Sequence, residues 1–293
     1  MNKCNLLRKR LAEPGIILSP GVYDCLSAKI AERTGFEVVI TSGFGISGSV
    51  LGYPDYGLLT ATEMLNAAGN ISKSVDIPLI ADIDTGYGNP INVVRTIKDV
   101  VCLGIAGVIL EDQEWPKRCG HLDGKRIIAM EEHVEKIRAA RFTSGESRLV
   151  IVARTDARAE LGLAEAIRRG KAYYEAGADV IFIEAPQTKE ELKEIPSALP
   201  DVPLLANMIE GGKTPCLSAR ELEELGFKMG VFALSGLFAA TKAIEDCFRF
   251  LKENGTTSGF ENRSSFKDYK EIINMKKYQK LEEKFITRKP SFK

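Results

Sequence analysis

The 293-residue sequence is 44% hydrophobic and 27% charged, which suits one large globular domain, because barrels of this size fold without splitting. Forty Lys and Arg residues balance forty Asp and Glu residues, so there is no cationic surplus of the kind that nucleic-acid binding requires. No apolar run reaches the ~18 residues of a membrane span, and the N-terminus lacks a signal-peptide core, so we expect a cytoplasmic protein without membrane contact.

Eight short apolar, β-branched runs recur along the chain. Their apolar residues are continuous rather than alternating, which indicates strands buried on both faces, as in a parallel sheet. The runs are Ile16–Leu18, Val38–Ile40, Leu79–Ala81, Val108–Leu110, Leu149–Val152, Val180–Ile183, Leu204–Ala206 and Val231–Leu234.

Segments of helical period separate these runs, so that strand and helix alternate eight times. This alternation predicts a closed, parallel (β/α)8 barrel of the TIM type over residues 1–254. An open doubly wound sheet is the alternative, but no G-x-G-x-x-G follows the first strand. The predicted helices are Cys25–Thr34, Thr62–Val75, Pro90–Leu103, Met130–Phe142, Leu163–Ala176, Glu190–Leu199, Ser218–Leu225 and Phe238–Asn254.

The pattern changes in residues 255–293, which we interpret as a C-terminal helical extension. A flexible stretch, Gly255–Gly259, precedes a charged segment, Phe266–Phe285, whose apolar residues form one stripe at helical spacing. We expect this helix to pack on the barrel or on a neighbouring subunit.

Polar residues follow seven of the eight predicted strands. In a (β/α)8 barrel the carboxyl ends of all strands meet at one rim, where the chemistry takes place. Four carboxylates facing an Arg and an Asn at one rim exceed what solvation of loop starts explains. The residues at the strand ends are Ser42, Gly43, Asp82, Asp84, Glu111, Arg154, Glu184, Asn207 and Ser235.

Three of these carboxylates suggest a metal site. Asp82 and Asp84 are two apart on a strand, so both can point to one side, and Glu111 arrives from the next strand. Such carboxylates repel one another without a cation, and all-oxygen ligands favour Mg2+, with Mn2+ as a substitute. The alternative is a solvated acidic turn in which Asp84 caps the following helix.

Arg154 directly follows an apolar strand, where an unpaired guanidinium is costly. A substrate carboxylate held by both arms of the guanidinium would satisfy it. A structural ion pair with Glu184 or Asp156 is the alternative, and the two interpretations are compatible.

Two loops on the same rim are predicted to move. The loop after the fourth strand carries Lys117, Arg118, Cys119 and His121, and we expect its cations to favour the thiolate of the cysteine. A basic surface loop with an incidental cysteine is the alternative. After the seventh strand, paired glycines including Gly211, together with the Thr214 hydroxyl, can close over a carboxylate, although a plain glycine turn fits as well.

The sequence resembles the isocitrate lyase and phosphoenolpyruvate mutase superfamily. The signature is K-[KR]-C-G-H at Lys117–His121, and further matching motifs extend over most of the chain. They are Ser19–Ala28, Thr41–Gly45, Gly52–Gly57, Ala81–Asn89, Ala153–Ala157, Phe182–Pro186 and Ala206–Pro215.

The resemblance implies a barrel whose last helix is exchanged between subunits, giving dimers and tetramers. It also implies Mg2+ on Asp84, with Asp82 and Glu111 reaching it directly or through waters. Asp55 would border the site, which the residues alone did not indicate. The residues implied to hold the substrate are Ser42, Gly43, Arg154, Glu184 and Asn207.

Departures from the superfamily pattern narrow the expected function. Phosphoenolpyruvate mutases typically carry Asn where Cys119 stands, and isocitrate lyases proper are longer. We therefore expect a Mg2+-dependent carbon–carbon lyase acting on a 2-hydroxy di- or tricarboxylate such as 2-methylisocitrate or 2,3-dimethylmalate, with Cys119 as general acid. The loop residues Lys117, Arg118 and His121, together with Arg154, are expected to disperse the charge of the departing enolate. Carboxyphosphonoenolpyruvate phosphonomutase, oxaloacetate hydrolase and a non-catalytic carboxylate-binding barrel are the alternatives. Substrate fit is expected to depend on Thr41, Phe44, Leu234, Ser235 and Phe238.

Overall fold

The computed structural model describes residues 2–285 of the chain. The chain divides into two compact units, residues 1–238 and 239–293. The predicted boundary between residues 254 and 255 stays a prediction. No helix among the described residues is long and apolar enough to cross a lipid bilayer.

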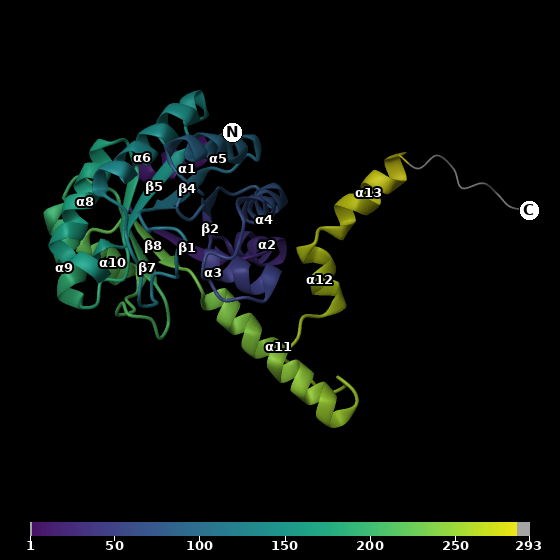
Figure 1. Ribbon diagram of the computed structural model, residues 1–293. Coiled ribbons are helices and arrows are strands. Elements are labelled where there is room, and N and C mark those ends of the chain that lie inside the picture. The colour runs from purple at the N-terminus through teal and green to yellow at the C-terminus, as the bar shows by residue number, and fades with distance from the viewer. Residues whose placement is uncertain (1, 286–293) are drawn as a thin grey trace, which may run out of the picture. The chain divides into compact units, whose positions relative to one another are not determined.

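The first unit contains a closed barrel of eight parallel strands in sequence order, with β8 pairing back to β1 (Figure 1). This confirms the predicted (β/α)8 fold and excludes the open sheet. The strands are β1 (Ile17–Val22), β2 (Val39–Thr41), β3 (Leu79–Asp82), β4 (Gly107–Glu111), β5 (Val150–Thr155), β6 (Val180–Ile183), β7 (Leu204–Met208) and β8 (Met229–Phe232).

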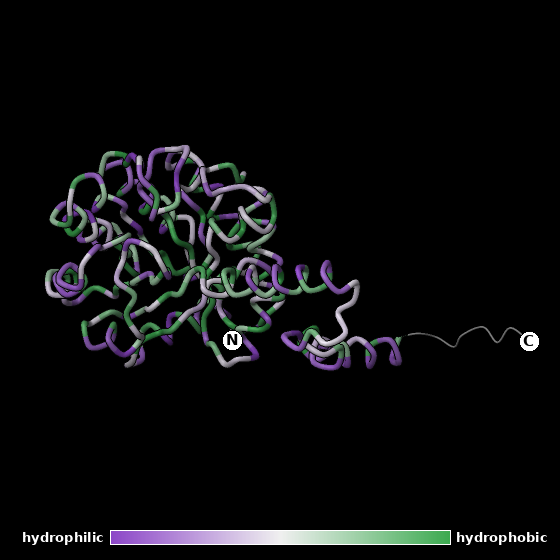
Figure 2. The backbone as a smooth tube through the Cα atoms, turned by 90° about the horizontal axis from the view of Figure 1, so that it is seen from below, coloured by the Kyte–Doolittle hydropathy of each residue, from purple (hydrophilic) through white to green (hydrophobic). Residues whose placement is uncertain are grey.

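Helices surround the strands and bury their apolar faces against them. In Figure 2 the strands are mostly hydrophobic, whereas hydrophilic segments gather on the outer helices. The helices and short turns of the first unit are α1 (Lys3–Ala12), α2 (Cys25–Thr34), α3 (Gly43–Ile46), η1 (Ser47–Leu51), α4 (Ala61–Ser74), α5 (Pro90–Cys102), α6 (Met130–Ser144), η2 (Gly145–Ser147), α7 (Ala157–Leu161), α8 (Leu163–Glu175), α9 (Lys189–Ala198) and α10 (Ala219–Leu225).

Alternation along each strand divides the core into two layers. In β5, Val150 and Val152 pack inside the barrel, whereas Ile151 and Ala153 pack beneath the helices. Because side chains alternate between faces, the next residue of the inward series is Arg154. The same count places Ser42, Asp82, Asp84, Glu111, Glu184 and Asn207 on the inward series of their strands.

The N-terminal helix α1 closes the opposite end of the barrel. Its Leu7 is fully buried and packs in the interior cluster with Ile17 and Val150. The predicted site residues lie at the other end of the barrel, where the strands reach their carboxyl ends.

The second unit, with the end of the first, is helical. Where one helix was predicted over Phe266–Phe285 the structure has two, so this prediction was wrong in detail. The break falls at Asn274, whose φ of 54° is left-handed, a conformation that Asn tolerates better than most residues and that ends a helix. The helices are α11 (Ser235–Asn254), α12 (Phe266–Ile272) and α13 (Met275–Phe285).

Candidate active site

Asp82 and Asp84 lie at the end of β3, and each has a distinct environment. The Asp82 carboxylate accepts the backbone N–H groups of Gly43 and Asp84, both at 3.0 Å. The Asp84 Oδ2 atom is buried and accepts no hydrogen bond. Burial raises the pKa of Asp84 to about 6, against the opposing effect of the Lys117 ammonium. Helix α5 begins with Asn89 as its cap, so Asp84 is not the cap that the alternative reading required.

Glu111 lies at the end of β4 beside Arg154. Its Oε2 atom is 3.3 Å from Arg154 Nη1 and accepts the Gln113 side-chain amide at 3.2 Å. The other oxygen, Oε1, is buried without a hydrogen-bond partner. Burial raises the pKa of Glu111 well above its usual range. An orphaned, buried carboxyl oxygen of this kind is suited to a cation or a water bound to one.

The balance of buried charge at the rim favours a divalent cation. Six carboxyl groups are buried there with three cations, Lys117, Lys125 and Arg154, so carboxyl groups outnumber cations. Among residues 2–285, no three His, Cys, Asp or Glu side chains form a ready-made metal cluster. Mg2+ usually keeps several waters and needs only one or two carboxylates, so the open oxygens fit it. The carboxyl groups are Asp55, Asp82, Asp84, Glu111, Asp156 and Glu184.

Arg154 is held by Asp156 and also borders Glu184. Its Nε and Nη2 atoms donate to the two oxygens of Asp156 at 2.9 and 3.0 Å, and Nε lies 3.4 Å from Glu184 Oε2. The structural ion pairs that formed the alternative interpretation are therefore present. They do not use every N–H group of the guanidinium, so the substrate-carboxylate interpretation stays a prediction that is compatible with these ion pairs.

The loop after β4, residues 114–126, is the flap that the sequence predicted over the site. An isolated antiparallel bridge between Gln113 and Ile127 closes its base. The Gln113 side chain then clasps the flap from inside, since it donates to the Arg118 carbonyl at 2.8 Å and accepts the Arg118 N–H at 3.0 Å. The flap is thus a defined, hydrogen-bonded structure.

Lys117 reaches from the flap into the site and is buried there. Its Nζ atom lies 2.7 Å from an oxygen of Asp55 and 2.7 Å from one of Asp84. Burial alone would lower the pKa of Lys117, but these carboxylates outweigh it and raise the pKa, so the ammonium stays charged. Arg118, by contrast, is exposed and lies over the Tyr56 ring at 5.5 Å, so its side chain stays on the outer surface of the flap.

Cys119 lies on the same rim as Asp84, as the predicted mechanism required. Its backbone N–H donates to the Asp55 carbonyl at 3.1 Å, and the Asp55 side chain shares Lys117 with Asp84. The expectation of a thiolate was wrong, because burial raises the pKa of Cys119 to about 11 and nearby carboxylates act in the same direction. The cations of the motif are directed elsewhere, so the thiol stays protonated.

His121 connects the flap to β6 and to the loop after β7. The Lys213 backbone N–H donates to Nδ1 at 2.9 Å, so the proton of the neutral ring is on Nε2, which lies 2.9 Å from Glu184 Oε1. Burial opposes ionisation of Glu184, but Arg154 and His121 outweigh it and lower its pKa to about 2.

Strand β7 and the loop after it each contribute one buried polar atom that has no hydrogen-bond partner, Asn207 Oδ1 in the strand and Thr214 Oγ1 in the loop. Buried polar atoms without partners are uncommon, and a ligand that supplies the missing partner is one explanation. Gly211 is exposed and has a φ of 74°, so it forms the turn of this loop.

Two glycines permit the close approach of the flap and the strand ends. A β-carbon on Gly120 would stand 2.4 Å from Arg154 Nη2 and 2.4 Å from the Glu184 side chain. One on Gly43 would stand 2.9 Å from the Lys117 ammonium. At Gly120 the Glu184 side chain leaves no room for a β-carbon, whereas at Gly43 the nearest atom is the end of the Lys117 side chain, which can shift.

Sequence reasoning missed two buried residues, Gln113 at the base of the flap and Lys125 within it. The Lys125 ammonium donates to the Gly120 carbonyl and lies 3.5 Å from Asp156 Oδ1. A lysine two residues beyond Asp123 gives no signal of burial by itself. Asp55 was also missed by reasoning from the residues, and only the family resemblance indicates it. The one signal in the sequence itself is a single acidic residue between two glycines.

Comparison with known proteins identifies the family. The chain matches the phosphoenolpyruvate phosphomutase family over residues 7–252. It is 42% identical to 2,3-dimethylmalate lyase of Eubacterium barkeri, covering 98% of this chain and 99% of that protein. It is 40% identical to 2-methylisocitrate lyase of Bacillus subtilis, strain 168, covering 94% and 90%. It is 45% identical to the chloroplastic carboxyvinyl-carboxyphosphonate phosphorylmutase of Arabidopsis thaliana, covering 94% and 82%.

Solved structures agree with this result. Oxaloacetate acetylhydrolase in complex with the inhibitor 3,3-difluorooxalacetate superposes with a TM-score of 0.92 at 35% identity, covering 97% of each chain. Phosphonopyruvate hydrolase in complex with oxalate and Mg2+ gives a TM-score of 0.89 at 30% identity, covering 98% of this chain and all of the other. The chain belongs to the phosphoenolpyruvate mutase/isocitrate lyase superfamily, which confirms the resemblance and the prediction of an enzyme from a group that includes lyases.

Proposed function

We propose that this protein is a Mg2+-dependent carbon–carbon lyase that cleaves an alkylated 2-hydroxy di- or tricarboxylate to a 2-oxo acid, such as pyruvate, and a carboxylate. The observation that carries the proposal is the position of Cys119, whose backbone N–H donates to the Asp55 carbonyl while the Asp55 carboxylate shares Lys117 with Asp84. A retro-aldol cleavage leaves electrons on a carbon atom, and that carbon then needs a proton. Relatives named as 2,3-dimethylmalate lyase and 2-methylisocitrate lyase support this reaction class.

The residues of the rim would carry out the proton transfers of the reaction. The 2-hydroxyl proton passes to a carboxylate of the site as the carbon–carbon bond breaks, and Cys119 donates its proton to the carbon of the departing enolate. Return of the hydroxyl proton to the thiolate completes the cycle. A thiol pKa near 11 keeps Cys119 protonated at neutral pH, as a proton donor requires.

The metal would be held by Asp84, with Asp82 and Glu111 reaching it directly or through waters. Its chemistry is Lewis-acid polarisation of the 2-oxygen, for which Mg2+ is the expected ion and Mn2+ a substitute. The orphaned oxygens of Asp84 and Glu111 support this assignment. Lys117 would supply further positive charge where the enolate forms.

The substrate carboxylates would bind around Arg154 and the loop after β7. The outer edge of the Arg154 guanidinium suits a carboxylate, and Asn207 and Thr214 offer polar atoms that lack partners. Ser42 and the backbone of Gly43 and Gly211 complete the proposed set. His121 would hold the flap closed on Glu184, and Arg118 would fix the outer surface of the flap, so that water is excluded.

Carboxyphosphonoenolpyruvate phosphonomutase and oxaloacetate hydrolase are the alternatives, because a carboxyvinyl-carboxyphosphonate phosphorylmutase and an oxaloacetate acetylhydrolase are among the similar proteins. Phosphorus–carbon bond formation does not release a carbon that needs protonation, so a half-buried thiol whose pKa is raised by burial favours the lyase over the phosphonomutase.

The test is a panel of malate and citrate analogues, including 2,3-dimethylmalate and 2-methylisocitrate, with coupled detection of pyruvate. Parallel reactions with a carboxyphosphonate and with oxaloacetate would be followed by phosphorus NMR and by oxalate release. Mg2+-dependent pyruvate release from an alkylated substrate supports the proposal. Turnover of only the phosphonate or of oxaloacetate would replace it, and binding without turnover would favour a non-catalytic barrel.

We also propose that the protein works as a homo-oligomer, a dimer of dimers with α11 exchanged between subunits. Apolar side chains on the C-terminal helices support this, since Phe248 of α11 is 64% exposed and Phe285 of α13 is 70% exposed. Sedimentation velocity would test the oligomeric state.

We also propose a cytoplasmic location, because all six cysteines are free thiols, as expected in a reducing compartment.

A further inference from the structure

Asp112 follows the last residue of β4 and faces away from the barrel mouth. Strand alternation sends Glu111 inward, so Asp112 faces the helices, where it is fully buried. Its Oδ2 atom accepts the Tyr173 hydroxyl at 2.8 Å and Arg169 Nη1 at 2.9 Å, both from α8. These two contacts anchor the carboxylate to the helix layer.

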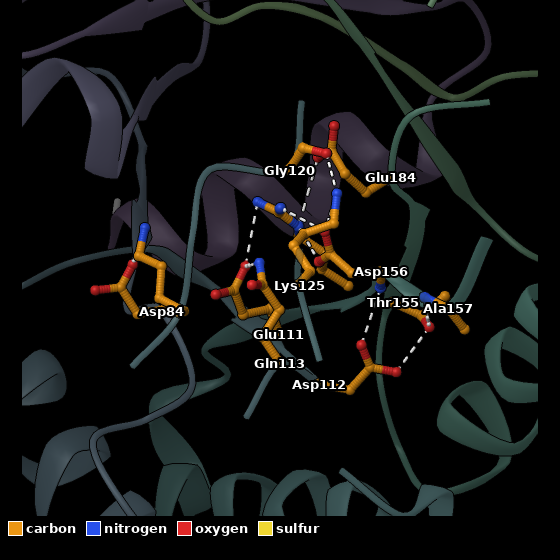
Figure 3. Close-up of polar contacts among 12 residues, drawn as sticks. Asp84, Glu111, Asp112, Gln113, Gly120, Lys125, Thr155, Asp156, Ala157 and Glu184 are labelled. Atoms are coloured by element: carbon orange, nitrogen blue, oxygen red, sulfur yellow. Dashed lines mark hydrogen bonds and ion pairs between the residues drawn. The ribbon is translucent and has the colours of Figure 1, made fainter. Parts of the chain in front are cut away.

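The same carboxylate also holds the end of β5. Its Oδ2 atom accepts the Thr155 hydroxyl at 2.7 Å, and Oδ1 accepts the backbone N–H of Asp156 at 2.9 Å (Figure 3). Four donors therefore converge on one buried side chain, two from α8 and two from consecutive residues of the β5 terminus. A carboxylate that only neutralised Arg169 would not require the two contacts to the strand end.

Asp156 carries this constraint into the site. Its carboxylate accepts two hydrogen bonds from the Arg154 guanidinium, at 2.9 and 3.0 Å. The Asp112 backbone N–H in turn donates to the Arg154 carbonyl at 3.3 Å. Asp112 thus determines where the Asp156 backbone lies, and the Asp156 carboxylate determines the direction in which Arg154 points.

We propose that Asp112 is a positioning residue for anion binding, which acts through Asp156 to hold the Arg154 guanidinium ready for a substrate carboxylate. The proposal rests on the proposed function for the role of Arg154. It assigns to Asp112 no contact with the substrate.

The experiment measures binding of oxalate, in the presence of Mg2+, to the full-length protein by calorimetry. Asp112→Asn should weaken binding at least ~10-fold, and Thr155→Val, which removes one donor and is the milder change, about 3-fold or more. Glu165→Gln is the matched control, because Glu165 accepts Arg169 Nε at 3.0 Å on the outer side of the network. The Glu165→Gln variant should change oxalate affinity less than about 2-fold, even if its melting temperature falls as much as that of Asp112→Asn.

A double-mutant cycle distinguishes positioning from general destabilisation. In an Arg154→Lys background, Asp112→Asn should have little further effect on oxalate affinity, because the residue through which it acts is already altered. Thr155→Val carries the test if Asp112→Asn does not fold. Unchanged oxalate binding in the folded variants, additive effects in the cycle, or no oxalate binding by the wild type would each overturn the proposal. Because binding is measured without turnover, absence of lyase activity alone would refute only the proposed function.

Discussion

Gly120 lies so close to Arg154 that a β-carbon at this position would stand 2.4 Å from the Nη2 atom of the guanidinium. The flap therefore closes only because residue 120 has no side chain. We predict that Gly120→Ala folds normally but keeps the flap open, with turnover reduced at least ~10²-fold because Cys119 is displaced.

Two measurements check this prediction. Trp115 is the only tryptophan of the chain and lies in the flap, so its fluorescence reports flap position in the wild type and in the variant. Gly48→Ala is the control, because a β-carbon there would meet nothing within 4 Å. Wild-type turnover together with wild-type fluorescence in Gly120→Ala would show that the flap does not need this close approach.

The buried carboxylates lead to a prediction about metal dependence. Chelation should abolish turnover and Mg2+ should restore it, with Mn2+ as a substitute. Asp84→Ala should lower turnover about 10³-fold or more and weaken Mg2+ binding measured by calorimetry, since the lost charge stabilisation is worth several kcal/mol. Asp99→Asn, on the exposed side of α5, is the matched control. Full activity of Asp84→Ala in chelator would refute a metal at this residue.

His133 makes a prediction about stability and pH. It is fully buried and packs edge-on against Tyr173, with ring centroids 4.6 Å apart. Burial, helped by the positive charges of Lys136 and Arg169, lowers the pKa of His133 to about 3. Between this value and the unfolded pKa near 6.5, the unfolded chain binds a proton that the folded chain does not, so stability falls as pH decreases through this window.

His133 alone should therefore remove about 2 kcal/mol of unfolding free energy between pH 7 and pH 5. His133→Phe keeps an aromatic ring beside Tyr173 and should show a shallower loss by that amount, measured from urea unfolding midpoints at both pH values. Parallel pH dependence in the two proteins would mean that His133 titrates normally in the folded state. All other titrating groups are common to both proteins and cancel in the comparison.

Strand alternation explains why much of the site could be predicted from sequence. Continuous apolar runs located the strands, and polar residues at their carboxyl ends had to meet at one rim. Because Val150 and Val152 point into the barrel, alternation also predicts that Arg154 points inward and Thr155 outward, as the structure shows. The fold and the strand-borne residues follow from periodicity, which is a local property of the chain.

Features that depend on the flap could not be predicted in the same way. Whether Lys125 is buried, and whether Gln113 clasps the backbone of Arg118, depends on how a loop folds back on its own base. The pKa of Cys119 was expected to fall because cations are adjacent in sequence. In the structure the Lys117 ammonium points to Asp55 and Asp84, and burial decides the shift in the opposite direction.

The most direct test of the account is turnover of Cys119→Ser on whichever 2-hydroxy acid the wild type cleaves, with Cys102→Ser, at the end of α5, as the control for an exposed thiol outside the site. We predict that Cys119→Ser folds, binds Mg2+ and substrate with wild-type affinity, and loses at least ~10²-fold in turnover, because a serine hydroxyl is a far weaker acid than the thiol. Turnover within a few-fold of wild type would contradict the account, since the enolate would then receive its proton from another group.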